Sequence, residues 1–417
     1  MLGAAAAYER ALGLHRSGHL DEAADLYQQV LVDVPAHFGA LHLLGVVQGQ
    51  RRRFAEALDL IGRAVHLDPS VAAAHAHLGN AQHALNRFED ALASYERALA
   101  LQPRFWLALM GRGKTLWSLS RLSDALASYD AALDVQPECA EALMNRGDIL
   151  LTLHRTSDGV ASLRRAMECG ADPERIRFVL ASIGREPVPD RAPAGYVRDL
   201  FDDYAGRFDG DLIGLLRYRV PELLSEAVLR DSPPGSIDIL DLGCGTGLCG
   251  TRLKAIARRL TGVDLSPGML DKARELGVYT ELECAELTQY LAGHEEFDLV
   301  VAGDVLIYLG DLAPVFAGVR RVLRFDGRFV FSVEAANEGD VELGATRRYR
   351  HSRVYLEGLA AAHGFELDAI EEHVLRLEAG NPVGGYVVRL RLPALPGREY
   401  ADQPVRLSCS SSDSSRS

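Results

Sequence analysis

The sequence predicts two domains of different classes: an all-α superhelix of helix-turn-helix repeats, followed by an α/β domain built on a parallel sheet. Three observations predict this order. The chain has 417 residues, more than the ~100–200 residues of one ordinary domain. Prolines recur at one constant interval in the first half, at Pro35, Pro69, Pro103 and Pro137. From Ser236 onward, short apolar runs alternate with amphipathic segments, which is typical of a sheet covered by helices on both faces.

Three further series of residues, called ladders below, recur at the same interval as the prolines. They consist of glycines, alanines and larger apolar residues: Gly45, Gly79, Gly113 and Gly147; Ala23, Ala57, Ala91 and Ala125; Leu20, Phe54, Phe88 and Leu122. Small residues let paired helices touch closely, larger ones fill the seam, and proline follows a helix that it cannot continue. The pattern and its period resemble the tetratricopeptide repeat (TPR) family. It covers residues 4–173 as about five units, within a domain of residues 1–185.

The resemblance implies that the first helices of the repeats line a concave face on which a protein or peptide partner binds. By the family's register, six residues are expected to point toward this groove: Asn80, His83, Lys114, Trp117, Asn145 and Asp148. The alternative is that each is an ordinary solvated helix position. The fifth unit has Thr156 and Gly159 in place of the larger residue and the alanine, which indicates a capping or docking role.

Composition marks the limits of the second domain. Residues 186–195 contain three prolines in a short polar stretch, which indicates a linker. Seven of the last ten residues are serines, too polar to bury a core, so we expect a disordered tail at residues 394–417. The second domain then spans residues 196–393.

Charge and hydropathy restrict the partners. The formal net charge is −13, and an acidic surface repels phosphate backbones, so we expect no nucleic-acid partner. No run approaches the ~18 apolar residues of a membrane span and the start lacks a secretory pattern, so we expect no membrane association and a cytoplasmic location. The six cysteines are scattered without metal-ligand spacing, so no metal site is expected.

A glycine-rich loop follows the first predicted strand of the second domain. The strand at residues 237–242 leads into Gly243, Gly245 and Gly247, which let the backbone turn tightly and approach a ligand. The next predicted strand ends in Asp264, one helix and one strand after Asp241, where a carboxylate can bind both ribose hydroxyls. This spacing predicts a Rossmann-like adenosine site.

Charge distinguishes the candidate ligands of that site. NAD is the first possibility, but the loop has the pattern GxGxG rather than GxGxxG, and Asp241 precedes it. A carboxylate beside a pyrophosphate is repulsive, whereas beside a sulfonium and an ammonium it is favourable. Four stretches, DLGCGTG, VDLSPGML, FDLVVAGDVLIYL and VLRFDGRFVFS, resemble class I S-adenosylmethionine-dependent methyltransferases across residues 195–393. The fused pair is similar to the bacterial predicted methyltransferases that carry TPRs.

The resemblance implies S-adenosylmethionine (SAM) as the cofactor, with Asp241 near its ammonium and Asp264 on its ribose. The full implied set is Tyr204, Asp241, Gly243, Cys244, Gly245, Gly247, Asp264, Leu265, Met269, Glu286 and Asp304. The family commonly has Asp where Cys284 stands, so the adenine amino group is read by Glu286 or by backbone alone. Tyr204 belongs to FDDYAGRFD, at residues 201–209, which resembles a helix that closes over the cofactor. The alternative for Tyr204 is an aromatic ring that packs at helical spacing.

Methyl transfer is an in-line displacement at a carbon that the sulfonium activates, so the enzyme mainly aligns the acceptor and excludes water. A hydroxyl or ammonium acceptor also needs a base within hydrogen-bond reach. The candidates are Asp304 and Tyr308 after the fourth strand, with Tyr349 and His351 in RRYRHS. The alternatives are that His351 is a satisfied histidine and that Asp304 binds only loop backbone.

Taken together, these patterns predict a SAM-dependent methyltransferase whose repeats recruit a protein, peptide or carrier-bound substrate. Two alternatives stay open. The first is a small-molecule O- or N-methyltransferase whose repeats serve assembly. The second is a TPR scaffold or sensor with a non-catalytic SAM-binding domain.

Overall fold

The computed structural model describes residues 3–204, 217–229, 236–293, 296–378 and 380–394. By contacts between residues, the chain divides into two compact units. The first runs as far as Tyr196 and includes Ala345–Arg347, and the second comprises most of the chain from Val197 onward. The tail predicted at residues 394–417 lies, after residue 394, outside the described residues.

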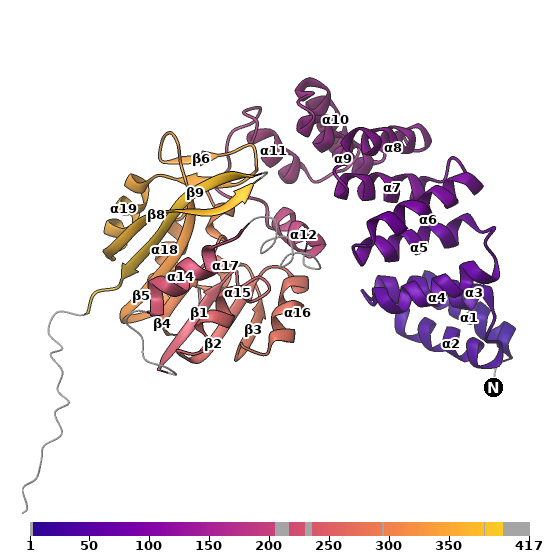
Figure 1. Cartoon of the computed structure of the whole chain (residues 1–417), viewed down its shortest axis with the longest axis horizontal. Helices are drawn as coiled ribbons and strands as arrows, with labels where there is room; N and C mark the ends of the chain where they lie inside the picture. The colour runs from indigo at the N-terminus through magenta and orange to yellow at the C-terminus, as the bar shows by residue number, and fades with distance from the viewer. Residues whose placement is uncertain (1–2, 205–216, 230–235, 294–295, 379, 395–417) are drawn as a thin grey trace, which may run out of the picture. The chain divides into compact units, whose positions relative to one another are not determined.

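The first unit is all helical, as predicted (Figure 1). Its first ten helices form five successive pairs, and one more helix follows. The helices are α1 (Ala4–Arg16), α2 (Leu20–Asp33), α3 (Phe38–Gln50), α4 (Phe54–Leu67), α5 (Ala72–Ala84), α6 (Phe88–Leu101), α7 (Trp106–Ser118), α8 (Leu122–Val135), α9 (Ala140–Thr152), α10 (Thr156–Glu168) and α11 (Pro173–Ala181).

The regularly spaced ladders pack as predicted. The alanine ladder is fully buried, and each residue of the larger ladder begins the second helix of its pair. A Cβ atom at Gly79 would lie 2.7 Å from the Tyr95 ring, and one at Gly113 would lie 2.9 Å from the Tyr129 ring. These glycines therefore allow buried tyrosines of the second helices to contact the backbone of the first helices.

A further ladder is not visible from residue types. Backbone with positive φ closes the turn after the first helix of each pair, at Gly18, Arg52, Asn86, Ser120 and His154. Only the first of these positions holds glycine, so the sequence pattern does not reveal them.

Two histidines join consecutive repeats. The Nε2 atom of His42 in α3 lies 2.8 Å from Nδ1 of His77 in α5, within hydrogen-bond distance. Burial lowers the pKa of His42 to about 4, and the neighbouring His77 lowers it further. The pKa of His77 is also lowered, chiefly by burial. The folded repeats therefore favour the neutral form of both rings.

Acidification should destabilise the repeats through this pair. Neutral histidines stabilise the fold fully above the unfolded pKa of ~6.5, and the contribution falls as the pH drops from there toward 4. We expect a loss of about 1–2 kcal/mol of unfolding free energy over this window from His42. Denaturant titrations at pH 7 and pH 4.5 measure it, with His42→Gln as the comparison. Equal losses in the variant and the wild type would exclude His42 as the cause.

The second unit contains a nine-stranded sheet within the described residues, in the order β3-β2-β1-β4-β5-β7-β6. Strands β1 to β5 are parallel to their neighbours in this order, while β9 pairs antiparallel with both β5 and β8. The strands are β1 (Ile237–Leu242), β2 (Ala257–Asp264), β3 (Glu281–Cys284), β4 (Phe297–Ala302), β5 (Leu323–Ala335), β6 (Val341–Leu343), β7 (Tyr349–His351), β8 (Glu366–Glu378) and β9 (Asn381–Arg391).

Helices accompany these strands, most of them between consecutive strands along the chain (Figure 1). They are α12 (Ala194–Tyr204), α14 (Val220–Leu229), α15 (Leu248–Leu253), α16 (Pro267–Leu276), α17 (Leu287–Tyr290), η1 (Leu306–Tyr308), α18 (Ala313–Val322) and α19 (Arg353–Ala362). The predicted linker at residues 186–195 overlaps the start of α12, which begins at Ala194. Within the described part of the chain, no helix is long and apolar enough to cross a membrane.

The central strands are buried on both faces. In β4, Leu299 and Val301 pack into one cluster with α14 and α15, whereas Val300 and Ala302 pack into another with α18 and α19. This alternation follows from the two-residue period of a strand. With both faces covered, the carboxyl ends of β1, β2 and β4 are the part of the sheet left to form a site.

Candidate functional site

The glycine-rich loop leaves β1 at the carboxyl edge of the sheet. Gly243, Gly245 and Gly247 all have positive φ, at 66°, 54° and 98°. A Cβ atom at Gly243 would lie 2.4 Å from Cγ2 of Val305, in the loop after β4. Gly243 is therefore required both by backbone conformation and by close packing. The loops after β1 and β4 therefore lie against each other.

Asp241 is buried just before this loop. The hydroxyl of Tyr279 donates a hydrogen bond to its Oδ2 atom at 2.7 Å. Burial raises the pKa of Asp241 to about 7; the Tyr279 bond lowers it, and the nearby Asp264 raises it. A bound cation would favour the ionised carboxylate, so this environment suits a positively charged ligand.

Tyr279 was not predicted from the sequence. Cβ atoms at Gly250 and Gly262 would lie 2.4 Å and 2.8 Å from its ring, so both glycines make room for it. Nothing in the residues around Tyr279 indicates this contact, because Asp241 is 38 residues away in the chain.

Asp264 lies at the end of β2, where the sequence places it. Its Oδ2 atom accepts a bond from the Gly245 amide at 2.9 Å, and its Oδ1 atom accepts one from the Ser266 amide at 2.9 Å. Burial raises the pKa of this carboxyl, and the backbone bonds counteract that effect. Each oxygen keeps a further lone pair that can accept a hydroxyl, so the arrangement fits two ribose hydroxyls.

Helix α12 is held beside Asp264 by Asp202. The Oδ1 atom of Asp202 accepts bonds from the Ser266 hydroxyl at 2.5 Å and from the Gly268 amide at 3.0 Å. The predicted closing segment thus does meet the site, through a residue that sequence reasoning passed over. Tyr204 is the last residue of α12, but its side chain and residues 205–209 lie outside the described residues.

The residues predicted around adenine differ in how far they are buried. Met269 is fully buried in α16, Leu265 is half-buried, and Cys284 is exposed at the end of β3. The carboxylate of Glu286 caps α17, accepting a bond from the Gln289 amide at 3.0 Å. Reading of adenine by Glu286 therefore stays a prediction. Cys244 is buried in the loop, where burial raises the pKa of its thiol.

Two of the predicted bases lie at the site. Asp304 has positive φ, its amide donates to the Ser332 hydroxyl at 2.9 Å, and Arg376 donates to its Oδ2 atom at 2.7 Å. Burial raises the pKa of Asp304, and Arg376 lowers it. Tyr308 ends η1, and its ring contacts that of Phe201 in α12 at a centroid distance of 5.5 Å.

The positions of His351 and Tyr349 do not support their predicted role as bases. Both are fully buried in β7. The Nε2 atom of His351 lies 3.2 Å from the carbonyl oxygen of Gly310, and burial lowers the pKa of the ring to about 4. A fully buried ring bonded to backbone is not open to an acceptor, so we leave both residues out of the acceptor site.

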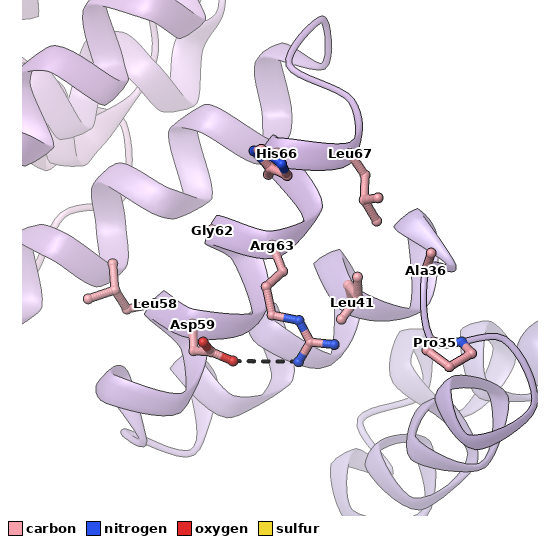
Figure 2. A pocket seen from close by; sticks show the side chains of 9 residues that line it. All are labelled: Pro35, Ala36, Leu41, Leu58, Asp59, Gly62, Arg63, His66 and Leu67. Atoms are coloured by element: carbon pink, nitrogen blue, oxygen red, sulfur yellow. Dashed lines mark ion pairs between the residues drawn. The ribbon is translucent and has the colours of Figure 1, made fainter.

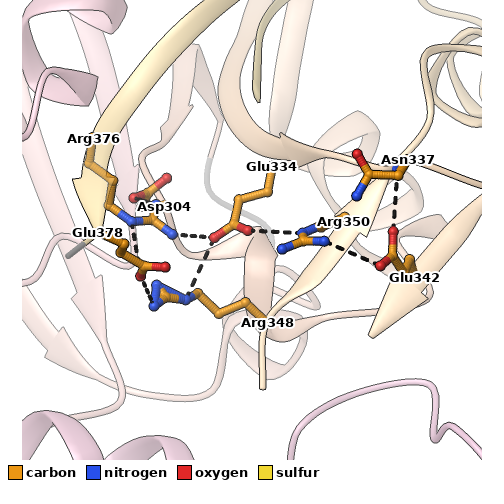
Figure 3. Close-up of polar contacts among 8 residues, drawn as sticks. All are labelled: Asp304, Glu334, Asn337, Glu342, Arg348, Arg350, Arg376 and Glu378. Atoms are coloured by element: carbon orange, nitrogen blue, oxygen red, sulfur yellow. Dashed lines mark hydrogen bonds and ion pairs between the residues drawn. The ribbon is translucent and has the colours of Figure 1, made fainter. Parts of the chain in front are cut away.

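A charged network extends from Asp304 across β5, β6, β7 and β8 (Figure 3). Arg376 and Glu334 are almost fully buried and form an ion pair. Arg350 bonds Glu342 at 3.2 Å and lies 3.5 Å from Glu334. The network comprises Asp304, Glu334, Glu342, Arg348, Arg350, Arg376 and Glu378. Among the described residues, no cluster of His, Cys, Asp and Glu is suited to a metal ion.

The six predicted groove residues lie on α5, α7 and α9, two on each helix. Asn80 and Lys114 are exposed, and His83, Trp117 and Asn145 are half-buried. Asn80 accepts a bond from the Tyr95 hydroxyl at 2.7 Å, and His83 lies 3.0 Å from the Thr115 hydroxyl.

Asp148 is the exception in this set. It is buried in the first unit, where Arg347 of the segment Ala345–Arg347 donates to its Oδ1 atom at 2.5 Å. Because its carboxylate is buried and paired, we leave Asp148 out of the groove set.

A pocket of about 490 Å³ occurs elsewhere in the repeats (Figure 2). Arg63 and Asp59 of α4 form an ion pair of 3.6 Å in it. Its lining residues are Pro35, Ala36, Leu41, Leu58, Asp59, Gly62, Arg63, His66 and Leu67. None of them belongs to the predicted groove set, and most lie on a second helix rather than a first.

Comparison with known families agrees with both halves of the chain. Residues 240–331 match the family model of a methyltransferase domain. Residues 8–72, 42–104, 78–133 and 110–174 match that of the tetratricopeptide repeat. These matches confirm the two resemblances predicted from the sequence.

Individual relatives match part of the chain. The chain is 29% identical over 198 residues to the biotin biosynthesis bifunctional protein BioHC of Saccharophagus degradans, covering 42% of this chain and 34% of that protein. It is 33% identical over 108 residues to the malonyl-[acyl-carrier protein] O-methyltransferase of Serratia marcescens, covering 26% and 42%. The chain thus spans about a third to two fifths of the length of these relatives.

A solved structure, the magnesium protoporphyrin IX methyltransferase of Synechocystis PCC 6803 with bound SAH, aligns with a TM-score of 0.39. The two chains are 16% identical, and the alignment covers 48% of this chain and 98% of that one.

Proposed function

We propose that this chain, a methyltransferase domain joined to tetratricopeptide repeats, transfers the methyl group of S-adenosylmethionine to a protein, peptide or carrier-bound acceptor that its repeats capture. The observation that supports the cofactor is a pair of carboxylates, buried Asp241 and half-buried Asp264, on either side of a glycine loop whose first residue tolerates no side chain. Two carboxylates at this loop suit a cationic nucleoside and oppose a pyrophosphate.

The chain's own residues would bind and orient the reactants. Asp264 would accept the ribose hydroxyls while the Gly245 amide keeps its carboxylate in place. Asp241, fixed by Tyr279, would face the ammonium of the methionine part. The cofactor, when bound, supplies a methyl carbon activated by a sulfonium. Asp304 and Tyr308 then border the acceptor side, where alignment and exclusion of water govern the rate.

The repeats would supply the acceptor. Exposed Asn80 and Lys114 and half-buried Trp117 lie on first helices of consecutive repeats, a mixture of polar and aromatic groups that suits an extended peptide. The relative from Serratia marcescens acts, by its name, on a carrier-bound acyl group. That name favours an acceptor attached to a protein over a free metabolite.

Changing the groove should impair acceptor use without affecting cofactor binding. In the full chain, Lys114→Glu combined with Trp117→Ala reverses one charge and removes one aromatic side chain on the first helix α7. We expect the Michaelis constant for the acceptor to rise about tenfold, because binding energy that is equal in the ground and transition states acts on that constant. Incubation of lysate proteins with labelled SAM, followed by mass spectrometry, identifies the acceptor, and steady-state kinetics measures the effect.

Arg97→Glu is the matched control, since Arg97 is an exposed cation on the second helix α6. Both variants are first checked for an unchanged melting temperature. Acceptor kinetics identical to wild type in the α7 variant would mean that the repeats do not recruit through this face. Turnover on a free metabolite with no labelled protein would instead favour the small-molecule alternative.

A further inference from the structure

The network of Figure 3 is not neutral. It contains three arginines and four carboxylates, so within the described residues it carries one excess negative charge. The charge is unevenly compensated. Glu334 has Arg348, Arg350 and Arg376 within 4 Å, whereas Asp304 has Arg376 as its ion-pair partner. Asp304, like Glu342, is therefore paired with a single arginine of the network.

Asp304 is also held in one orientation. Arg376 is only 3% exposed and bonds its Oδ2 atom, while the Ser332 hydroxyl lies 3.2 Å from its Oδ1 atom. The backbone of Asp304 has a φ of 51°, a conformation that a non-glycine residue keeps only where its surroundings impose it. A buried arginine and a hydroxyl thus fix the position of a carboxylate at the end of β4.

This carboxylate borders the cofactor loop. The next residue, Val305, occupies the space that a side chain at Gly243 would need. Tyr218, which precedes α14, is influenced by both Asp304 and Asp241, and each raises the pKa of its hydroxyl, after burial as the main cause. The two carboxylates therefore act electrostatically on the same hydroxyl, one from the end of β1 and one from the end of β4.

We propose that Asp304 recognises the sulfonium charge and so distinguishes S-adenosylmethionine from its product S-adenosylhomocysteine (SAH). The inference rests on the proposed cofactor. The two ligands share the adenosine, the carboxylate and the ammonium, and they differ by one methyl group and one positive charge on sulfur. A carboxylate that acts on the sulfur changes the ratio of their affinities, whereas one that acts on the ammonium changes both affinities alike. Preference for the charged ligand would also favour product release.

Calorimetry with SAM and with SAH on the full chain tests this assignment. In Asp304→Asn, we expect the ratio of SAM to SAH affinity to fall about tenfold, the effect of removing one partly screened charge near the sulfur. In Asp241→Asn, we expect both affinities to fall by a similar factor, so that their ratio stays within about twofold of wild type. A loosened site would weaken both ligands equally, so the ratio separates charge recognition from a structural role.

A measurement on the wild-type chain keeps the inference testable if Asp304→Asn does not fold. Sinefungin carries an ammonium in place of the sulfonium, so it should bind more tightly than SAH, as SAM does. Sinefungin and SAM binding no tighter than SAH would overturn the inference, as would an unchanged ratio in folded Asp304→Asn. Failure of the wild-type chain to bind either SAM or SAH would instead overturn the proposed function.

Discussion

Replacing Arg376 with methionine should lower the free energy of unfolding of the second unit by about 3–5 kcal/mol, the usual cost of removing one partner from a buried ion pair. Arg376 is 3% exposed and lies between Glu334, which is also 3% exposed, and Asp304, which is 14% exposed. Without its guanidinium, two carboxylates would remain in the interior with one fewer positive charge between them. Urea denaturation followed by circular dichroism measures the loss.

Two further variants show whether the uncompensated charge is the cause. Arg350 bonds Glu334 and Glu342, but its side chain is 27% exposed, so Arg350→Met should cost only about 1 kcal/mol. Adding Glu334→Gln to Arg376→Met should restore part of the stability, since it removes one of the two stranded charges. Were Arg376→Met to unfold at the same urea concentration as wild type, the ion pairs would not contribute to the fold.

The repeats could be predicted from the sequence because each of their contacts recurs. A residue that packs at one position of a repeat packs again at the same position of the next, so four ladders identify the helices without any long-range information. A contact that occurs only once does not show in these ladders. Asp148 stands in the register of Asn80 and Lys114 and was placed in the groove with them, yet Arg347, 199 residues away, pairs with it.

The site could be predicted only where its residues lie close together in the chain. The loop of Gly243, Gly245 and Gly247 is a local pattern, and Asp264 follows it at a spacing set by one helix and one strand. Arg376 reaches Asp304 only because β8 pairs with β9 and β9 pairs antiparallel with β5. That arrangement joins residues 72 apart, and no local pattern contains it.

His351 is the reverse case, a residue that the sequence suggests for the site but that the fold buries. In RRYRHS, Tyr349 and His351 stand on either side of Arg350, at the two-residue period of a strand. Tyr349 and His351 are both buried. A strand of three residues is too short to be recognised from such an alternation. The histidine therefore resembled a catalytic base in the sequence, although its ring packs in the interior against the loop at Gly310.

Replacing Asp264 with alanine should weaken SAM binding by about 1.5–3 kcal/mol, or roughly 10- to 150-fold, the range for losing hydrogen bonds to a charged group. The carboxylate sits at the end of β2 with one backbone bond on each oxygen, leaving lone pairs for both ribose hydroxyls. Titration calorimetry with SAM measures the change. Asp271→Ala is the control, because Asp271 is exposed on α16 and pairs only with Arg274 among the described residues.

Part of that loss could arise from the loop rather than from the ribose, since Asp264 also accepts the Gly245 amide. Asp264→Asn separates the two contributions. Its side-chain oxygen can still accept the Gly245 amide, while the negative charge, the bond from the Ser266 amide and one acceptor for a ribose hydroxyl are gone. We expect this variant to lose at least half of the binding free energy that alanine loses. Full affinity in the asparagine variant, with a loss only in alanine, would assign Asp264 to holding the loop and would place the ribose contact on another residue.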